Sequence, residues 1–363
     1  MPKTIGIDAS RLESKEKTGV EIYSKKLIEE ILKLPGEKDL VLYSRKKLPS
    51  SLMKGKALTG KVANRYFDCE RFFTIFFLQK EILRNPPEIL FVPSAAIPFK
   101  IPKKTKCITT IHDVAFHFFP ELYSSFERFY LRNSTKRAIK NCSKIIVPSE
   151  ATKEDLVEHF HCPEDKIEKI EMGFEMDGRW GMGVAKKKQF LFVGRIEEKK
   201  NLINAIKGFK KFSQKFPDYS FLLCGKPGFG YKKIRDEARE IKKIKFLGFV
   251  SEAEKIKLIR ESLALVLPSF YEGFGFPILE AQSLKTLVLC SEIKSNLETS
   301  GGLALFFNPE SPEEIFQTFE KSLDEKEREE LVKKASENVG RFSWERCARE
   351  TFGVLRKGLQ RKV

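Results

Sequence analysis

Short apolar runs rich in β-branched residues and phenylalanine recur along the whole chain, and segments with helical periodicity separate most of them. Such runs are typical of strands that are buried on both faces of a sheet. They lie at residues 4–9, 40–43, 89–92, 107–111 and 144–147, and again at 189–193, 221–224, 245–249, 263–267, 287–290 and 304–307. The helical segments lie at 20–34, 151–160, 202–216, 252–262 and 277–284. This alternation predicts an α/β protein with parallel, doubly wound sheets.

The two sets of strands predict two domains, at residues 1–178 and 179–341, followed by a helical tail at 342–363. The boundary falls in a glycine-rich stretch from Met176 to Gly183 that has no periodicity. Ser343 is the expected N-cap of the tail helix. In open α/β sheets, ligands bind beyond the carboxyl ends of the strands. The residues that directly follow each strand are therefore the candidates for function.

The chain has a net charge of +17, from 67 Lys and Arg against 50 Asp and Glu. This excess favours anionic partners such as phosphorylated substrates or an anionic membrane surface. The basic residues are scattered in short clusters such as Lys186 to Lys188. Because no nucleic-acid-binding motif accompanies them, we expect no nucleic-acid partner.

The cysteines are odd in number and widely spaced, without a C-x-x-C pair. The seven cysteines indicate free thiols in a reducing compartment. We find neither a signal peptide nor an apolar run near the ~18 residues of a membrane span. We therefore expect a cytoplasmic protein. His159 to Cys162 have no partner pair with zinc-type spacing, so we predict a helix end there and no metal site.

Two residues of the first domain lie where a ligand is expected. Gly19 opens the first helix, where backbone N–H groups and the helix dipole can meet a phosphate; the alternative is a loop glycine with positive φ. His112 follows the strand at 107–111, where an imidazole can donate a hydrogen bond or exchange a proton near neutral pH. The alternative for His112 is a structural histidine.

Gly194, Arg195 and Lys200 lie between the strand at 189–193 and the helix at 202–216. Arginine offers phosphate a bidentate fork and lysine offers it a point charge, so this loop is a candidate diphosphate site. The alternative is two surface cations in a basic protein. The glycine-rich segment at 225–230 lacks the Gly-Lys-Ser/Thr of a P-loop, and we predict a turn there.

The most informative segment runs from Ser269 to Glu280. Glu272 is expected in a loop and Glu280 about one turn inside a helix, and both carboxylates can accept hydrogen bonds from sugar or ribose hydroxyls. The intervening glycines allow the backbone to approach a ligand closely. The residues expected to do so are Gly273, Phe274, Gly275 and Phe276. An unrelated loop acid and helix acid would not explain the glycines and Pro277 between them.

Together these residues resemble the motifs of the retaining glycosyltransferases of family 4. The Glu-x7-Glu element at 272–280 is the most specific part, and the Gly-Arg…Lys-Asn element at 194–201 is nearly as specific. His112-Asp113 is similar to the family's first-domain motif. The resemblance implies the GT-B architecture: two Rossmann-like, doubly wound domains facing a central cleft, with the C-terminal helix crossing back to the first domain. The first would be the acceptor-side domain and the second the nucleotide-sugar-binding domain.

By this resemblance, the donor is a nucleoside-diphosphate sugar, either GDP-mannose or a UDP-hexose, used with retention and without a metal or other cofactor. Arg195 and Lys200 would neutralise the leaving diphosphate. Glu280 would hold the ribose, and Glu272 with the backbone N–H groups of 273–276 would hold the donor sugar. His112 would contact the sugar near its reacting carbon, and Gly19 would let the first helix approach the phosphates. The acceptor would be a glycan or lipid-linked glycan of a cell-surface polysaccharide.

The sequence also departs from the family pattern. Residues 281–287 lack the usual glycine and proline, so the helix and the next strand join differently. Glu21 adds a negative charge near the expected phosphates, and Glu197 and Glu198 change the charge of the second loop. These departures leave open a non-catalytic module that senses nucleotide sugars or glycans. A nucleotide-sugar epimerase of the same architecture is disfavoured, because it should lack the Glu272…Glu280 pairing.

Phenylalanine-rich segments beside basic residues, at 71–80 and 116–120, suggest contact of the first domain with an anionic membrane surface. For 71–80 an interior helix is the better interpretation. For 116–120 a packed loop and a membrane contact are equally supported.

Overall fold

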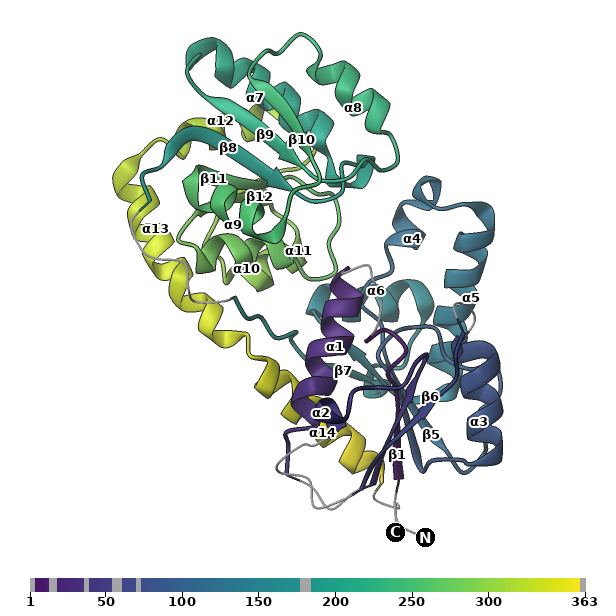
Figure 1. The fold of residues 1–363 in the computed structure, drawn as a ribbon. Coiled ribbons are helices and arrows are strands. Elements are labelled where there is room, and N and C mark those ends of the chain that lie inside the picture. Colours follow the sequence, from purple (N-terminus) through teal and green to yellow (C-terminus); the bar gives the residue numbers. More distant parts are fainter. Residues whose placement is uncertain are drawn as a thin grey trace. The chain divides into compact units, whose positions relative to one another are not determined.

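All strands of the described residues pair in parallel, in two separate sheets (Figure 1). The computed structural model describes residues 4–12, 18–35, 39–53, 61–69, 73–176 and 184–359. Met1–Gly173 together with Phe342–Val363 form one compact unit, unit 1, and Phe174–Arg341 form the other, unit 2. The predicted fold class, α/β with two Rossmann-like doubly wound sheets, is confirmed. Most of the predicted glycine-rich boundary, at 177–183, lies outside the described residues.

Unit 1 contains a sheet of seven strands, and its strand order reverses between β1 and β4. In spatial order the strands are β3 (Val62–Tyr66), β2 (Asp39–Ser44), β1 (Thr4–Asp8), β4 (Ile89–Val92), β5 (Lys106–Thr110), β6 (Cys142–Val147) and β7 (Ile167–Lys169). The apolar runs predicted the central strands, but not β3 and β7. β3 lies at the edge and has no buried residue, and β7 is only three residues long, so neither produces an apolar run.

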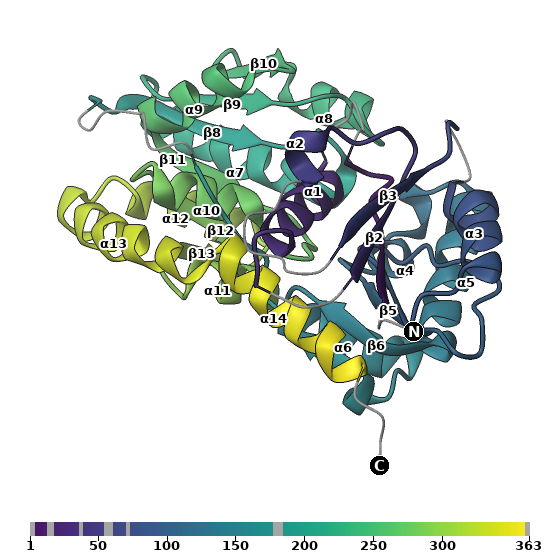
Figure 2. The same cartoon turned by 60° about the horizontal axis from the view of Figure 1, so that its bottom comes forward.

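The C-terminal helix packs on unit 1, as predicted. α14 (Trp344–Gly358) lies beside α1 (Gly19–Ile31) and also contacts β4 and β6 (Figure 2). Ser343 caps it through the backbone N–H of Arg346. The chain passes so close to α14 at Gly173 that a Cβ there would lie 2.4 Å from the backbone of Trp344. The other α-helices of unit 1 are α2 (Ser50–Met53), α3 (Gln79–Arg84), α4 (Ala115–Phe118), α5 (Ser125–Asn141) and α6 (Glu150–Phe160).

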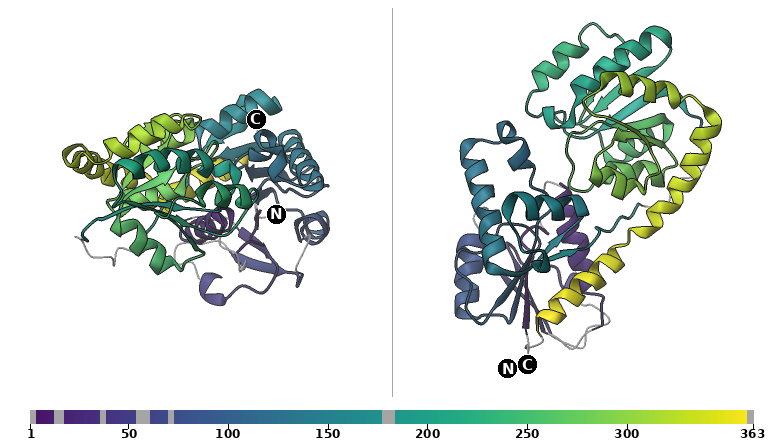
Figure 3. Two further views of the ribbon diagram at one scale, coloured as in Figure 1. Left: turned by 90° about the horizontal axis from the view of Figure 1, so that it is seen from above. Right: turned by 180° about the vertical axis from the view of Figure 1, so that it is seen from behind.

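Unit 2 repeats the same topology with six strands. In spatial order they are β10 (Ile244–Gly248), β9 (Ser220–Cys224), β8 (Lys187–Val193), β11 (Ser262–Leu267), β12 (Leu287–Ser291) and β13 (Leu305–Phe307). Its α-helices are α7 (Leu202–Lys215), α8 (Tyr231–Ala238), α9 (Glu252–Glu261), α10 (Phe276–Ser283), α11 (Lys294–Ser300), α12 (Pro312–Lys321) and α13 (Glu325–Asn338). Figure 3 shows α12 and α13 following one another beside this sheet.

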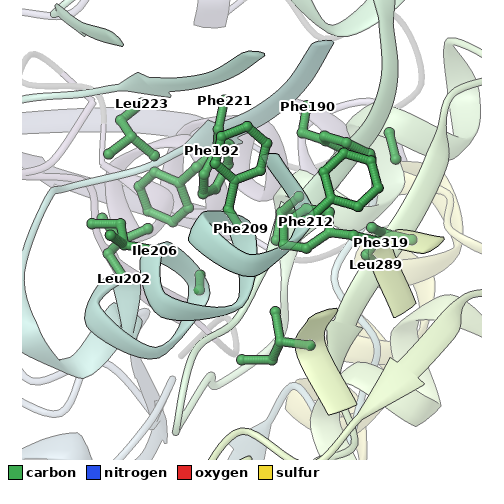
Figure 4. Packing of buried hydrophobic residues seen from close by; sticks show 14 of the residues in the cluster. Phe190, Phe192, Leu202, Ile206, Phe209, Phe212, Phe221, Leu223, Leu289 and Phe319 are labelled. Carbon is green, nitrogen blue, oxygen red and sulfur yellow. The ribbon is translucent and has the colours of Figure 1, made fainter. Parts of the chain in front are cut away.

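Phenylalanine rings form the centre of the unit 2 core (Figure 4). Phe190 on β8 meets Phe212 on α7 and Phe319 on α12 edge-on, with ring centroids 5.4 and 4.6 Å apart. All three side chains are fully buried. Buried aromatic rings contribute large apolar areas, and edge-to-face pairs add to this stabilisation. The core fixes α7 and α12 against β8, and so fixes the loop that joins β8 to α7.

The core of unit 1 contains both aliphatic and aromatic side chains. The phenylalanine-rich segment at 73–78 contributes to it, because Phe73, Ile75 and Leu78 are buried whereas Phe76 is exposed. The favoured interpretation of an interior helical segment therefore holds for these residues; Arg71 and Phe72 lie outside the described residues.

All seven cysteines are free thiols. Within the described part of the chain, no helix is long and apolar enough to cross a membrane.

The close contact between α7 and α12 can be tested at a glycine. A Cβ on Gly208 would lie 2.9 Å from the Pro312 carbonyl oxygen and from Ile315 Cγ2. We expect Gly208→Ala to destabilise unit 2 by ~1–3 kcal/mol through overpacking. This loss exceeds the ~1 kcal/mol by which alanine stabilises a helix relative to glycine. Gly353→Ala is the matched control, because a Cβ there meets nothing within 4 Å. It should leave stability unchanged or raise it in urea unfolding, and equal effects of the two substitutions would contradict the packing argument.

Candidate active site

The candidate residues of unit 2 lie on two neighbouring loops. Because β9 continues the sheet on one side and β12 on the other, the strand order reverses between β8 and β11. The loops that follow these two strands contain Arg195 and Lys200 after β8, and Glu272 after β11. Ligands of doubly wound sheets bind at such a reversal, beyond the carboxyl ends of the strands.

A buried ion pair joins the two loops. Lys200 Nζ lies 2.5 Å from Glu272 Oε1, and the two side chains are only 15% and 12% exposed. Ser269 Oγ donates a second hydrogen bond to the same carboxylate oxygen, at 2.7 Å. The backbone N–H of Phe270 donates to the carbonyl oxygen of Lys199 at 3.0 Å, so main chain and side chains both fix the loops together.

The electrostatics of Glu272 favour the carboxylate form. Burial alone raises its pKa, but the positive charges of Lys200 and Lys199 and the hydrogen bonds from Lys200 and Ser269 outweigh burial. The pKa of Glu272 therefore lies below its ordinary value. A charged carboxylate beside a lysine gives the site a fixed donor and acceptor at one point, which suits a ligand that carries both hydroxyls and phosphates.

The glycine-rich segment after β9 supports the loop that carries Arg195. A Cβ on Gly225 would lie 1.7 Å from the Gly194 carbonyl oxygen, so only glycine permits this approach. The backbone N–H of Ile196 donates to the carbonyl oxygen of Lys226, and the backbone N–H of Gly228 donates to the carbonyl oxygen of Ile196. The predicted turn at 225–230 therefore holds the loop after β8 in place through backbone hydrogen bonds. It leaves the Arg195 side chain exposed at the carboxyl edge of the sheet.

The loop after Glu272 turns directly into α10. Gly275 has a φ of +101°, which L side chains rarely adopt, and Pro277 lies in the first turn of the helix. The Thr299 hydroxyl donates to the Phe274 carbonyl oxygen. Asn338 Nδ2 in turn donates to the Thr299 carbonyl oxygen, at 2.9 Å. Sequence reasoning missed Thr299 and Asn338, because they lie outside the motif and are brought to it by folding.

Glu280 lies inside α10, as predicted, but it already has a partner. Lys255 Nζ on α9 lies 2.7 Å from Glu280 Oε1, and the side chains are 16% and 17% exposed. Burial raises the pKa of Glu280, and Lys255 only partly offsets this effect. No motif marked Lys255, since it lies on a helix with an ordinary alternation of Glu and Lys.

His112 lies after β5 in unit 1, where the sequence predicted it. Its Nε2 lies 3.2 Å from the Pro93 carbonyl oxygen, and Tyr23 packs against the ring edge-on with centroids 4.7 Å apart. Because a carbonyl only accepts, Nε2 carries the proton and Nδ1 keeps its lone pair. Burial lowers the pKa of His112, so the imidazole is neutral near pH 7.

The negative charge of Glu21 is compensated within unit 1. Gly19 is the first residue of α1, and Glu21 lies in the first turn of the same helix. Arg11 pairs with Glu21 at 2.5 Å, and the Thr18 hydroxyl also donates to its carboxylate. The expected repulsion between Glu21 and a ligand's phosphates is therefore reduced by the Arg11 guanidinium. Arg11 was not singled out in the sequence.

His159 to Cys162 form a helix end, as predicted. α6 ends at Phe160, and His161 adopts the left-handed conformation that is typical of a helix C-terminus. Among the described residues, no group of three or more His, Cys, Asp or Glu side chains is arranged to hold a metal ion.

Paired Rossmann-like units with a charged reversal point in the second are typical of the GT-B glycosyltransferases. The family model of glycosyl transferases group 1 matches residues 182–339, and the model of glycosyltransferase family 4 matches residues 18–177. Together they cover most of the chain, which belongs to this glycosyltransferase family.

Curated relatives agree with this assignment, and solved structures agree with the fold. The chain is 25% identical over 281 residues to the O-antigen chain mannosyltransferase B of Escherichia coli, covering 73% of each protein. It is 27% identical over 218 residues to the O-antigen chain mannosyltransferase RfbU of Salmonella typhimurium, covering 60% of each. A glycosyltransferase from Rickettsia africae superposes with a TM-score of 0.67 at 18% identity, over 99% of this chain and 100% of that one. Anabaena HepE, solved with UDP and glucose, superposes with a TM-score of 0.65 at 16% identity, over 98% and 100%.

The ion pair between Lys200 and Glu272 predicts a strong double-mutant effect. We expect Lys200→Met to destabilise unit 2 by ~3–5 kcal/mol, because it leaves a buried carboxylate without its counter-charge, and we expect the double variant Lys200→Met/Glu272→Gln to recover part of this loss. Lys211→Met is the control, since Lys211 and Glu313 are also 2.5 Å apart but about half exposed. It should cost less than ~1 kcal/mol.

The pH dependence of this loss has a definite sign. With its lowered pKa, Glu272 adds stability above its unfolded pKa of ~4.3, and this stability is lost as the pH falls through the folded value. Lys200→Met removes the lowering interaction, so the gap to the native chain should widen from pH 4 to pH 7 in urea unfolding. A gap that does not change with pH would show that charge compensation is not the cause.

Proposed function

We propose that this glycosyltransferase moves a hexose, with mannose as the first candidate, from a nucleoside-diphosphate sugar to a glycan or lipid-linked glycan of a cell-surface polysaccharide. The donor is GDP-mannose or a UDP-hexose, and the anomeric configuration is retained. The observation that carries the proposal is the Lys200–Glu272 pair beside the exposed Arg195 at the strand reversal of unit 2. The mannosyltransferase relatives support mannose as the sugar.

Charge stabilisation of the leaving diphosphate is the main catalytic contribution in this proposal. The bond from the anomeric carbon to the diphosphate oxygen breaks, and the electron pair stays on the diphosphate. The acceptor hydroxyl oxygen bonds to the anomeric carbon on the same face, and its proton passes to a phosphate oxygen. Arg195 and Lys200 stabilise the developing negative charge, so the reaction needs no metal ion. Glu272 holds Lys200 in place through their ion pair, which lowers the reorganisation needed during the reaction.

The remaining candidate residues bind the donor. Glu272 and the backbone N–H groups of Gly273, Phe274, Gly275 and Phe276 hold the sugar hydroxyls, and Gly194 belongs to the diphosphate loop. Glu280 accepts from the ribose, in competition with Lys255. His112 is neutral, so it meets the sugar as a hydrogen-bonding group. Gly19 leaves the start of α1 open to phosphate.

We assign acceptor binding to residues 1–178, nucleotide-sugar binding to 179–341 and a packing role to 342–363. The free thiols suit a reducing compartment, and we place the reaction on the cytoplasmic face of the membrane.

A sensor of nucleotide sugars remains the second candidate. The compensation of Glu21 by Arg11 favours the enzyme, because it removes the charge that suggested a sensor.

Release of nucleoside diphosphate from a panel of sugar nucleotides tests this function. In the presence of EDTA and a membrane lipid extract, we expect release from one donor and a product that retains the donor's anomeric configuration by NMR. Arg195→Ala should lower kcat at least tenfold, because a cation at the leaving group is lost. Arg239→Ala is the control and should leave the rate unchanged, because Arg239 is exposed and directly follows α8, outside the candidate loops. Donor binding without turnover in the native chain would instead support the sensor.

The membrane contact proposed from the sequence has a more specific candidate in the structure. Phe126 and Phe129, one helical turn apart on α5, are 76% and 70% exposed. Large exposed aromatic side chains are costly in water, and Arg128 and Arg132 on the same exposed stretch suit anionic headgroups. Of the segment at 116–120, Phe116 is buried and Phe118 is exposed. Sequence reasoning missed Phe126 and Phe129, because exposure is decided by how α5 packs.

Sedimentation with anionic liposomes at low salt tests this contact. We expect Phe126→Ser/Phe129→Ser to reduce the bound fraction at least fivefold, because two inserted rings are lost. Phe249→Ser is the matched control, since Phe249 is 74% exposed in unit 2. Equal losses in both variants would point to general hydrophobicity and not to α5.

A further inference from the structure

Unit 2 contains a basic cavity at the edge of the sheet opposite the candidate active site. Its volume is about 460 Å³, within the usual range of ligand sites. Lys187 is the first residue of β8 and Leu287 the first of β12, so the cavity lies at the amino ends of the strands. β8 has seven residues, which places this edge roughly 20 Å from Gly194. We call this cavity the amino-edge pocket.

Cations dominate the lining of the amino-edge pocket. They are Lys186, Lys187, Lys188, Lys285 and Arg328, against the carboxylates of Glu325 and Glu329. Two of the lysines are neutralised from outside the pocket, because Lys187 pairs with Glu261 and Lys188 with Asp218. Arg328 Nη2 lies 3.7 Å from Glu325 Oε1 on its own helix, but Glu325 is 77% exposed, so water screens this pair. The lining as a whole still carries five cations and only two carboxylates. Tyr219, Leu263, Leu287, Leu323 and Val332 supply apolar and aromatic surface.

Lys186 has no carboxylate partner among the described residues, although the chain contains 50 Asp and Glu. Its Nζ donates to the Arg260 carbonyl oxygen at 2.9 Å and to the Thr286 hydroxyl at 2.8 Å, and it forms no ion pair within the described part of the chain. Burial of the ammonium group, with Arg328 and Arg260 nearby, lowers the pKa of Lys186 to about 8. The residue as a whole keeps solvent access. A bound anion would offset the repulsion between the Lys186 ammonium and the guanidinium groups of Arg328 and Arg260.

Lys285 reaches the pocket from a strained backbone. It has a φ of +54° and follows Leu284, the C-cap of α10, at a helix-end position where the left-handed conformation normally favours glycine. A residue with a Cβ costs roughly 1–2 kcal/mol in this conformation. Strain of this kind persists where the side chain is needed or the surroundings impose it. The lysine here adds a cation to the wall of a cavity that is already basic.

We propose that the amino-edge pocket binds a phosphate group, carried by a soluble ester or by a lipid headgroup with its apolar part against Tyr219 and the leucines. Lys186, Lys285 and Arg328 bind the phosphate. This site is separate from the donor site and does not rest on the proposed transferase reaction. The apolar part of the lining distinguishes it from a simple counter-ion site.

Hydrogen exchange with inorganic pyrophosphate as the probe tests the proposal. We expect slower amide exchange at 283–288 and 323–332 in the native chain, with no such effect from KCl at equal ionic strength. Lys285→Gly should raise the thermal midpoint, because it relieves the positive φ, and should weaken this protection at least fivefold. A loss of binding in a stabilised variant cannot come from misfolding. Lys210→Gly on α7 serves as the control away from the pocket.

Two results would overturn the proposal: no protection of these segments at millimolar pyrophosphate, or equal protection in the native chain and Lys285→Gly. Vesicles with phosphatidic acid identify the source of the phosphate, with phosphatidylcholine vesicles as the blank. Protection of 283–288 by these vesicles in the Phe126→Ser/Phe129→Ser background supports a lipid headgroup. Protection by pyrophosphate alone supports a soluble ester.

Discussion

The ion pair between Lys200 and Glu272 is the interaction on which the candidate site depends. It joins the loops that follow β8 and β11, and it is largely shielded from water. A buried pair of this kind is costly to desolvate and is retained only where geometry and further hydrogen bonds are good. Ser269 and the backbone contact between Phe270 and Lys199 supply those bonds. The pair therefore positions a cation where a diphosphate is expected.

The parallel sheet explains why this interaction can form. Parallel strands send all their carboxyl ends to one edge, and the reversal of strand order leaves two adjacent loops there without a helix between them. The phenylalanine core holds α7 and α12 against β8, so the loop before α7 has a fixed base. Gly225 then allows the next loop to brace it. Packing far from the site thus determines the position of Arg195.

Charge compensation is a second theme of the structure. Glu21 is neutralised by Arg11, Glu280 by Lys255 and Glu272 by Lys200. The sequence pointed to all three acids, but of their cations it pointed only to Lys200, and not as the partner of Glu272. The amino-edge pocket is the exception, because Lys186 has no carboxylate partner among the described residues. A net charge of +17 says that such surplus cations exist, but not where they gather.

The sequence by itself determined the fold class and the order of the motifs. Buried parallel strands need apolar residues on both faces, so their pattern is visible in the chain, and strand-end loops place Arg195, Lys200 and Glu272 at one edge. Local sequence also set the start of α10 at Gly275 and Pro277. Only the tertiary structure decided which groups meet. Lys255, Thr299, Asn338 and the exposed rings of α5 carry no local signal, because side-chain partners and exposure depend on contacts between residues far apart in the chain.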